Sequence, residues 1–226
     1  MLGTTGRYDQ PAAPMQDPYQ SIPAPAVPPA GITSVYIGPG CPAAKCTLYS
    51  PGLYGQILVK NDTALFKPGL YYINNGGFGN AANGNMYMAT GYPADPATGS
   101  GMVVYNTGAG IFNIGANSTA HLVGSDNNSF YQGILFFQDR DGAARTHNLG
   151  GGGDIVLTGA LYMTNWLSVM QSQPSQYQTL NLGGNAGIQI NGSIVVSALT
   201  MAGTSYVTFN LAGGPSIESR RAGLVR

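Results

Sequence analysis

The chain has 226 residues and a formal net charge of zero, with nine Lys and Arg against nine Asp and Glu. Charged residues make up only 8% of the sequence, against roughly 25% in a typical soluble domain. Without a basic surface to hold a phosphate backbone, the sequence predicts no nucleic-acid partner. Solubility must come from Asn, Gln, Ser and Thr, a pattern that suits an extracellular protein.

Glycine and proline are abundant, with 34 and 15 residues, yet 43% of the residues are hydrophobic. Short apolar runs punctuated by Gly and Asn are typical of many short strands joined by tight turns. We therefore expect an all-β protein, with helical periodicity only at 165–171. No run approaches the roughly 18 apolar residues of a membrane-spanning helix, so no transmembrane segment is predicted. The first ten residues, MLGTTGRYDQ, show no apolar core of a signal peptide, so an export signal is not visible.

Residues 1–34 form the first predicted unit, an arm or linker. Its stretch DPYQSIPAPAVPPAG (17–31) is rich in Pro and Ala and can build neither a helix nor a central strand. We expect it to be extended and polyproline-like. It is either a flexible tether or an arm that lies across another surface, such as a neighbouring subunit. Residues 35–226 are predicted to form one β domain.

Two cysteines, Cys41 and Cys46, follow in GCPAAKC (40–46). The four residues between them allow a small loop to close, and a disulfide would imply an oxidising compartment. Two thiols without a nearby His or a further Cys cannot complete a tetrahedral zinc shell. The spacing therefore favours a disulfide, with free thiols as the alternative.

The predicted strands then follow in chain order as apolar runs: 56–60, 64–73, 101–106, 110–115, 120–124, 133–139, 154–163, 187–196 and 204–211. Segments 74–85, 148–153 and 181–187, between these runs, are rich in Asn and Gly. Because both residues tolerate positive φ, these segments are expected to be turns and loops.

One internal repeat is visible, in which 154–163 aligns with 187–196 at an offset of 33 residues. Ile155 meets Ile188 in this alignment, and apolar residues alternate with small or polar ones, as in strands with one buried face. Stacked repeats and Asn ladders favour a solenoid. We therefore predict a right-handed parallel β-helix of roughly six to nine coils, with the Pro-rich arm at its N-terminus. A β-sandwich is the alternative, because it also gives many short strands with regular turns.

In the stretch GILFFQDRDGAART (133–146), an apolar segment is followed by a cluster of charged residues, Asp139, Arg140 and Asp141. In an extended strand the two aspartates would share one side, as a paired-carboxylate site requires, with Arg140 on the other side. The turn signal at 141–142 instead favours a strand that leaves the core, with Asp and Arg pairing locally and capping exposed amides. A Ca²⁺ or other ligand site is an alternative. The histidines and serines lie in no metal or triad spacing, so neither an enzyme nor a cofactor is predicted.

Tyrosines beside polar loops are the candidate surface contacts. Tyr54, Tyr72, Tyr87 and Tyr92 are chosen because exposed Tyr can stack on sugars or bind another protein. The alternative is that these rings cover the flanks and ends of the solenoid.

The order of the motifs resembles a known family. The motifs are YSPGLYGQILVKNDTALFKPGLYYINNGGF (49–78), GSGMVVYNTG (99–108), YQGILFFQDR (131–140), DIVLTGALYM (154–163) and IQINGSIVVSALTMAG (188–203). As an ordered set they are similar to the C-terminal, β-helix-like region of bacterial Flp, or tight-adherence, pilus-assembly proteins of the TadE/TadG-like group. The resemblance covers about residues 17–210 and implies a secreted surface module connected with pili or adhesion. Family members usually begin with a membrane-spanning helix, which this sequence does not show.

From these features we expect an extracellular structural protein, a β-solenoid that self-associates into, or decorates, a surface filament. Its contacts would be the N-terminal arm and the ends of the solenoid, because unlike ends that join head to tail give open filaments. The alternative is an adhesin module that binds surface glycans through Tyr and Asn in its loops. A polysaccharide-degrading enzyme is disfavoured because carboxylates and lysines are scarce.

Overall fold

The structure, a computed structural model, describes residues 17–115, 117–127, 129–141, 143–165, 177–184, 187–203 and 207–210. Within these ranges the chain forms twenty strands and no helix, which confirms the all-β prediction. The predicted helical window at 165–171 lies outside the described residues, apart from Asn165. In the part of the chain that is described, no helix is long and apolar enough to span a bilayer.

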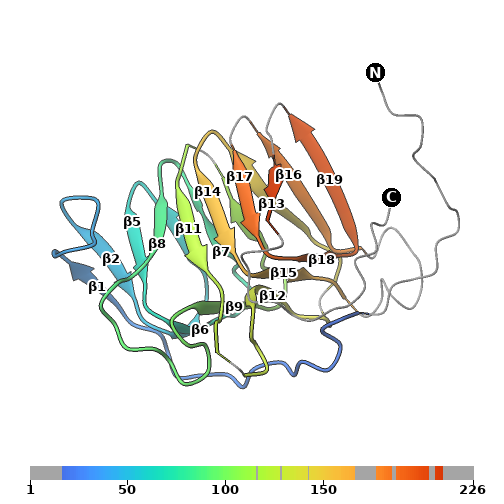
Figure 1. Ribbon diagram of the computed structural model, residues 1–226, viewed down its shortest axis with the longest axis horizontal. Coiled ribbons are helices and arrows are strands. Elements are labelled where there is room, and N and C mark those ends of the chain that lie inside the picture. Colours follow the sequence, from blue (N-terminus) through green and yellow to red (C-terminus); the bar gives the residue numbers. More distant parts are fainter. Residues whose placement is uncertain are drawn as a thin grey trace, which may run out of the picture.

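The strands form three sheets, and within each sheet the strands lie side by side along the length of the molecule (Figure 1). Sheet I has the order β1 (Thr33–Tyr36), β2 (Cys46–Tyr49), β5 (Thr63–Phe66), β8 (Asn85–Met88), β11 (Ala120–Val123), β14 (Ile155–Thr158), β17 (Ile188–Asn191), β20 (Val207–Phe209). Sheet II has the order β3 (Gly52–Tyr54), β6 (Gly69–Ile73), β9 (Met102–Asn106), β12 (Ile134–Gln138), β15 (Ala160–Met163), β18 (Ile194–Val196). Sheet III has the order β4 (Ile57–Lys60), β7 (Phe78–Ala81), β10 (Phe112–Ile114), β13 (Thr146–Gly151), β16 (Thr179–Gly184), β19 (Ala198–Gly203).

From β2 onward the chain visits sheets I, II and III in this fixed order, so successive strands always lie in different sheets. Each strand inside a sheet pairs in parallel with the strand one round earlier and the strand one round later, and a strand at the edge of its sheet has one of these two partners. Strand β1 is different, because it lies antiparallel to β2 at the edge of sheet I. The three sheets therefore grow together, one strand each per round.

The register confirms the internal repeat. Ile155 pairs with Ile188 and Leu157 with Ile190 in sheet I, while Leu161 pairs with Ile194 in sheet II. The same offset continues into sheet III, where the sequence THNLGG of β13 lies on TLNLGG of β16, residue by residue. The repeat is thus longer than the apolar pattern alone indicated.

The prediction of loops at the three Asn- and Gly-rich segments is wrong in part, because β7 lies within 74–85, and β13 and β16 extend into 148–153 and 181–187. Glycine is favoured there by close stacking: a Cβ on Gly150 would lie 1.8 Å from the carbonyl oxygen of Gly183 on the next strand. Asparagine is stabilised by its neighbour, since Asn181 Nδ2 donates to Asn148 Oδ1 at 3.1 Å. Strands β1, β2, β3, β8 and β19 also lie outside the predicted runs.

The main core fills the space between the three sheets. Its members are fully buried and come from inward positions of every sheet, for example Phe66, Tyr71, Phe78 and Met86. The rings of Phe112 and Phe136 stack at 4.6 Å between centroids. Burial of this cluster supplies the main driving force for the fold.

Candidate functional site

The outer face of sheet II carries a row of aromatic side chains, one from each of four neighbouring strands. Tyr72 of β6, Tyr105 of β9, Phe137 of β12 and Tyr162 of β15 lie in register. Their ring centroids are 5.1, 5.1 and 5.2 Å apart along the row. These residues alternate with core residues that point inward, and this is why the strands of sheet II read as continuous apolar runs.

A strap formed by residues 17–30 crosses this face. At one end, the ring of Tyr19 is 3% exposed and meets Tyr162 edge to face at 5.3 Å, and its hydroxyl lies 3.2 Å from Ser193 Oγ. At the other end, Leu53 N donates to Pro29 O at 2.8 Å in β3. Figure 1 shows the strap as the dark blue segment along the lower side of the molecule. It therefore spans sheet II from β18 to β3.

Arg140 fixes the end of the strap. Its side chain is buried, and Nε donates to the Tyr162 hydroxyl at 2.6 Å, which in turn donates to Asp17 Oδ2 at 2.6 Å. Its two terminal nitrogens donate to the carbonyl oxygens of Ile22, at 2.6 Å, and of Tyr19. Asp17 Oδ2 also lies 3.9 Å from Arg140 Nε, so the buried guanidinium has a carboxylate partner.

Burial and this network act on the ionisation of the tyrosines. Burial, followed by the hydrogen bond to Asp17, raises the pKa of Tyr162 above its ordinary value. Burial also raises the pKa of Tyr105, and the neighbouring Asp139 carboxylate, which accepts a hydrogen bond from it, adds to the effect. Both side chains are therefore neutral hydrogen-bond donors over the physiological pH range.

A groove of about 310 Å³ lies between the strap and the end of β12. Its walls include residues 20–24 of the strap, the rings of Tyr105 and Phe137, and the three charged residues Asp139, Arg140 and Asp141. The arrangement with Arg140 on the other side from the two aspartates was predicted only for an extended strand. Strand β12 ends at Gln138, so the alternation of an extended strand does not continue through residues 139–141.

The charged cluster of residues 139–141 lies where the chain leaves the core after β12, as the apolar run before it indicated. Within this cluster, Asp141 N donates to Asp139 Oδ1 at 3.3 Å. The main partners of Arg140 lie 118 and 121 residues away in sequence. These partners were not predicted from the sequence, although it contained one signal. The strands of sheet II are continuous apolar runs, so both of their faces need to be covered.

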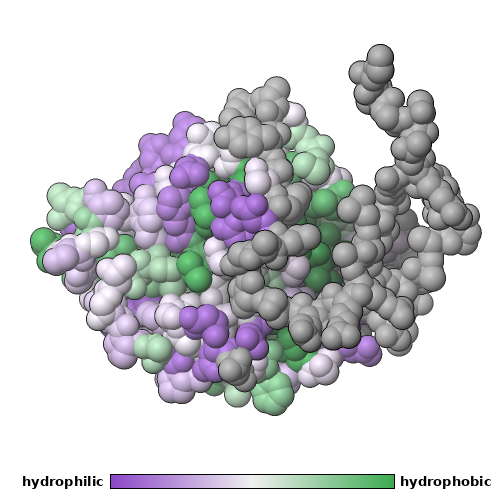
Figure 2. Space-filling view, in the orientation of Figure 1, coloured by the Kyte–Doolittle hydropathy of each residue, from purple (hydrophilic) through white to green (hydrophobic). Residues whose placement is uncertain are grey.

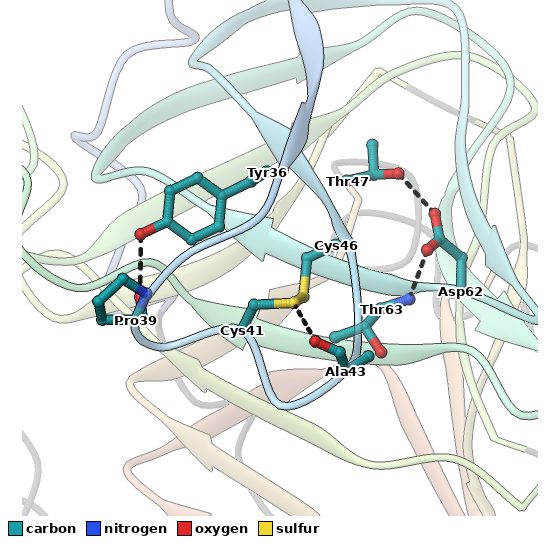
Figure 3. Close-up of a disulfide and its surroundings, with 8 residues drawn as sticks. All are labelled: Tyr36, Pro39, Cys41, Ala43, Cys46, Thr47, Asp62 and Thr63. Atoms are coloured by element: carbon teal, nitrogen blue, oxygen red, sulfur yellow. Dashed lines mark hydrogen bonds between the residues drawn. A yellow bond between two sulfur atoms is a disulfide. The ribbon is translucent and has the colours of Figure 1, made fainter.

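The two cysteines are joined by a disulfide, and their Cα atoms are 5.9 Å apart. The bond closes the loop between β1 and β2 (Figure 3). Next to it, Asp62 Oδ2 accepts from Thr47 Oγ1 at 2.6 Å, which ties this end of sheet I together.

The four candidate surface tyrosines are all half-buried, and each ring contacts another part of the chain. Tyr54 donates its hydroxyl to Ser50 O at 2.6 Å, and burial, with the nearby Tyr49, raises its pKa to about 12. Tyr72 begins the aromatic row, and Tyr87 meets His121 edge to face at 5.6 Å. Tyr92 lies under the Lys67 ammonium, 4.7 Å from the ring centroid.

The described residues contain no group of three or more His, Cys, Asp or Glu side chains that could hold a metal ion. The aromatic row, the groove and Arg140 together can bind an extended peptide. The row packs against an aromatic side chain, and the guanidinium donates hydrogen bonds to two backbone carbonyls and pairs with a carboxylate. Comparison of the chain with protein-family models, with curated proteins and with solved structures finds no match in any of the three.

Proposed function

We propose that the chain is an extracellular structural protein with the fold of a right-handed parallel β-helix. Its copies self-associate end to end to form a surface filament, or they decorate one. The winding is supported by the fixed order in which the chain visits sheets I, II and III. Connections between parallel strands of one sheet are right-handed in about 98% of cases. The resemblance to pilus-assembly proteins of the TadE/TadG-like group and the disulfide both support a location outside the cytoplasm.

The observation that carries the proposal is the exposed apolar surface at the two ends of the stack. At the first end, Ile32, Val35 and Ile37 are 68%, 71% and 77% exposed on and beside the edge strand β1. Figure 2 shows hydrophobic surface at this end, on the left. An edge strand with apolar side chains is a template for pairing with another chain.

At the other end, Leu199 and Met201 of β19 are 45% and 58% exposed. They pair in register with Leu180 and Leu182 of β16, whose side chains are buried in the core. The core positions therefore continue into β19, where they remain open. Because the two ends are unlike, contact between them is head to tail and gives an open filament.

The test is assembly of the purified full chain over a concentration series, followed by sedimentation velocity and negative-stain electron microscopy. We expect filaments that lengthen with concentration. Val35→Lys and Met201→Lys should each stop growth, because each places a charge at one end. A mixture of the two variants should form dimers only, since one intact end remains on each partner.

The matched control is Val123→Lys, which changes an apolar residue that is 41% exposed on β11, in the middle of sheet I. This variant should assemble like the unmodified chain. Monomers at every concentration of the unmodified chain would contradict the proposal, as would equal loss of assembly in the control.

A further inference from the structure

The contacts of the strap define a specific binding site. We call Arg140, Tyr162 and Ser193 the socket, and residues 17–22 of the strap the anchor. The anchor supplies a carboxylate, two backbone carbonyls and an aromatic side chain, and each has a partner in the socket. A buried guanidinium that loses such partners is unfavourable, so the socket requires an occupant with this chemistry.

The link that joins the anchor to the body is different in character. Residues 23–30 contain four prolines, and six of the eight residues are exposed. Proline has no backbone N–H to pair, and such a segment is a semi-rigid extended spacer of about 3.1 Å per residue, or about 25 Å in all. Among the described residues, the backbone hydrogen bond between this segment and a sheet lies at the β3 end, where Leu53 N donates to Pro29 O. Pro23 O also accepts a hydrogen bond from the Tyr131 hydroxyl at 3.4 Å, and Pro25 is buried. Among the described contacts, the spacer therefore has fewer hydrogen bonds to the rest of the chain than the anchor has.

The anchor also lies at a particular place in the stack. Tyr19 contacts β15 and the residue before β18, at the end opposite β1. This is the end at which β19 exposes Leu199 and Met201 and at which, in the proposed filament, the next copy is joined.

We propose that the socket also binds the anchor of a second copy of this chain, so that the strap is an exchangeable link between neighbouring copies. The inference rests on the proposed self-association for the identity of the partner. Exchange replaces every contact of the anchor with the same contact in another molecule. Its own anchor is favoured in dilute solution by effective concentration, and exchange becomes competitive when two copies are held end to end.

The experiment uses two full-length variants that each disable one half of the contact. The donor, Arg140→Met, keeps the anchor and loses the socket, while methionine retains the packing of the arginine stem. The acceptor, Asp17→Ala with Tyr19→Ala, keeps the socket and loses the anchor. Both also carry Val35→Lys and Met201→Lys, so that contacts between the sheet ends do not contribute.

We expect each variant alone to sediment as a monomer of about 23.4 kDa and an equimolar mixture to double in mass. The control is the acceptor mixed with a chain that carries both defects, which should remain monomeric. Failure of end-to-end assembly would leave this readout unchanged, so the two proposals fail separately. A mixture that stays monomeric, with both variants folded by circular dichroism, overturns the inference.

A second measurement covers the case in which the donor does not fold. A fluorescent peptide of residues 17–24 is titrated against the acceptor, and a peptide with alanine in place of Tyr19 serves as its control. We expect saturable binding that weakens at least tenfold for the control peptide. Equal binding of both peptides, or none, contradicts the inference.

Discussion

His147 is a buried histidine that the structure holds in its neutral form. It is fully buried on β13, and its Nδ1 accepts a hydrogen bond from Phe112 N at 3.0 Å. The proton must therefore sit on Nε2, which lies 3.2 Å from Gln178 Oε1. Burial, with a smaller contribution from the Arg145 charge, lowers the pKa of His147 to about 4, although the hydrogen bond to Gln178 opposes this.

The pH dependence follows from this lowered pKa. Between pH 6.5 and pH 4 the unfolded chain binds a proton at this histidine while the folded chain does not, so acidification favours unfolding. The stabilising contribution is complete above pH 6.5 and is lost as the pH falls to about 4. The difference between a pKa of 6.5 in the unfolded chain and about 4 in the folded chain corresponds to about 3 kcal/mol of stability.

The assay is urea denaturation at several pH values from 7 to 4, with His147→Leu as the reference. Leucine is chosen because Leu180 occupies the position in register with His147 on β16. We expect the free energy of unfolding of the unmodified chain to fall by about 3 kcal/mol more than that of the variant across this window. Parallel decreases in the two proteins would refute the reasoning, because other groups would then carry the whole dependence.

Three further predictions concern stability and use thermal or urea unfolding. Gly150→Ala should destabilise the fold by about 2 kcal/mol or more, because its Cβ would lie 1.8 Å from the backbone of the next strand. Gly183→Ala is the control and should cost clearly less, because its Cβ would lie 3.1 Å from the nearest atom. Similar losses of stability in the two variants would contradict the register. Replacing Cys41 and Cys46 by Ser should cost about 2 kcal/mol, as expected for a short closed loop, and an unchanged midpoint would count against this. Tyr162→Phe removes the hydroxyl that joins the arginine to the strap and should cost about 1.5–3 kcal/mol, with Tyr72→Phe, at the far end of the aromatic row, as the control.

Parts of the fold could be predicted from local patterns. The strands that carry alternating or continuous apolar residues appear where the runs indicated, from β4 to β18. The repeat at Ile155 and Ile188 gave the true register, because stacked positions in a parallel sheet share one environment and so select similar residues. Sheet III was largely missed, since the glycine and asparagine that stabilise its close stacking are also the residues that form turns.

The candidate site was predicted only as a cluster. Asp139, Arg140 and Asp141 stood out by charge in a chain with few charges, and the structure does bring them to one groove. Which group pairs with Arg140 could not be inferred, because Asp17 and Tyr19 are more than a hundred residues away and their segment carries no strand pattern. The pairing depends on where two distant segments meet across the outer face of sheet II.

By itself, the sequence determined the all-β class and the chemistry of most strands, because these depend on neighbours within a few residues. It also showed the 33-residue offset between two stacked copies, because stacked positions share one environment. The tertiary structure decided three other things: that parts of the Asn- and Gly-rich segments are strands, that the Pro-rich segment covers sheet II, and that Arg140 holds it. The reason is physical. Backbone pairing and burial can override local preference, and a buried charge selects its partner by position in space rather than by distance along the chain.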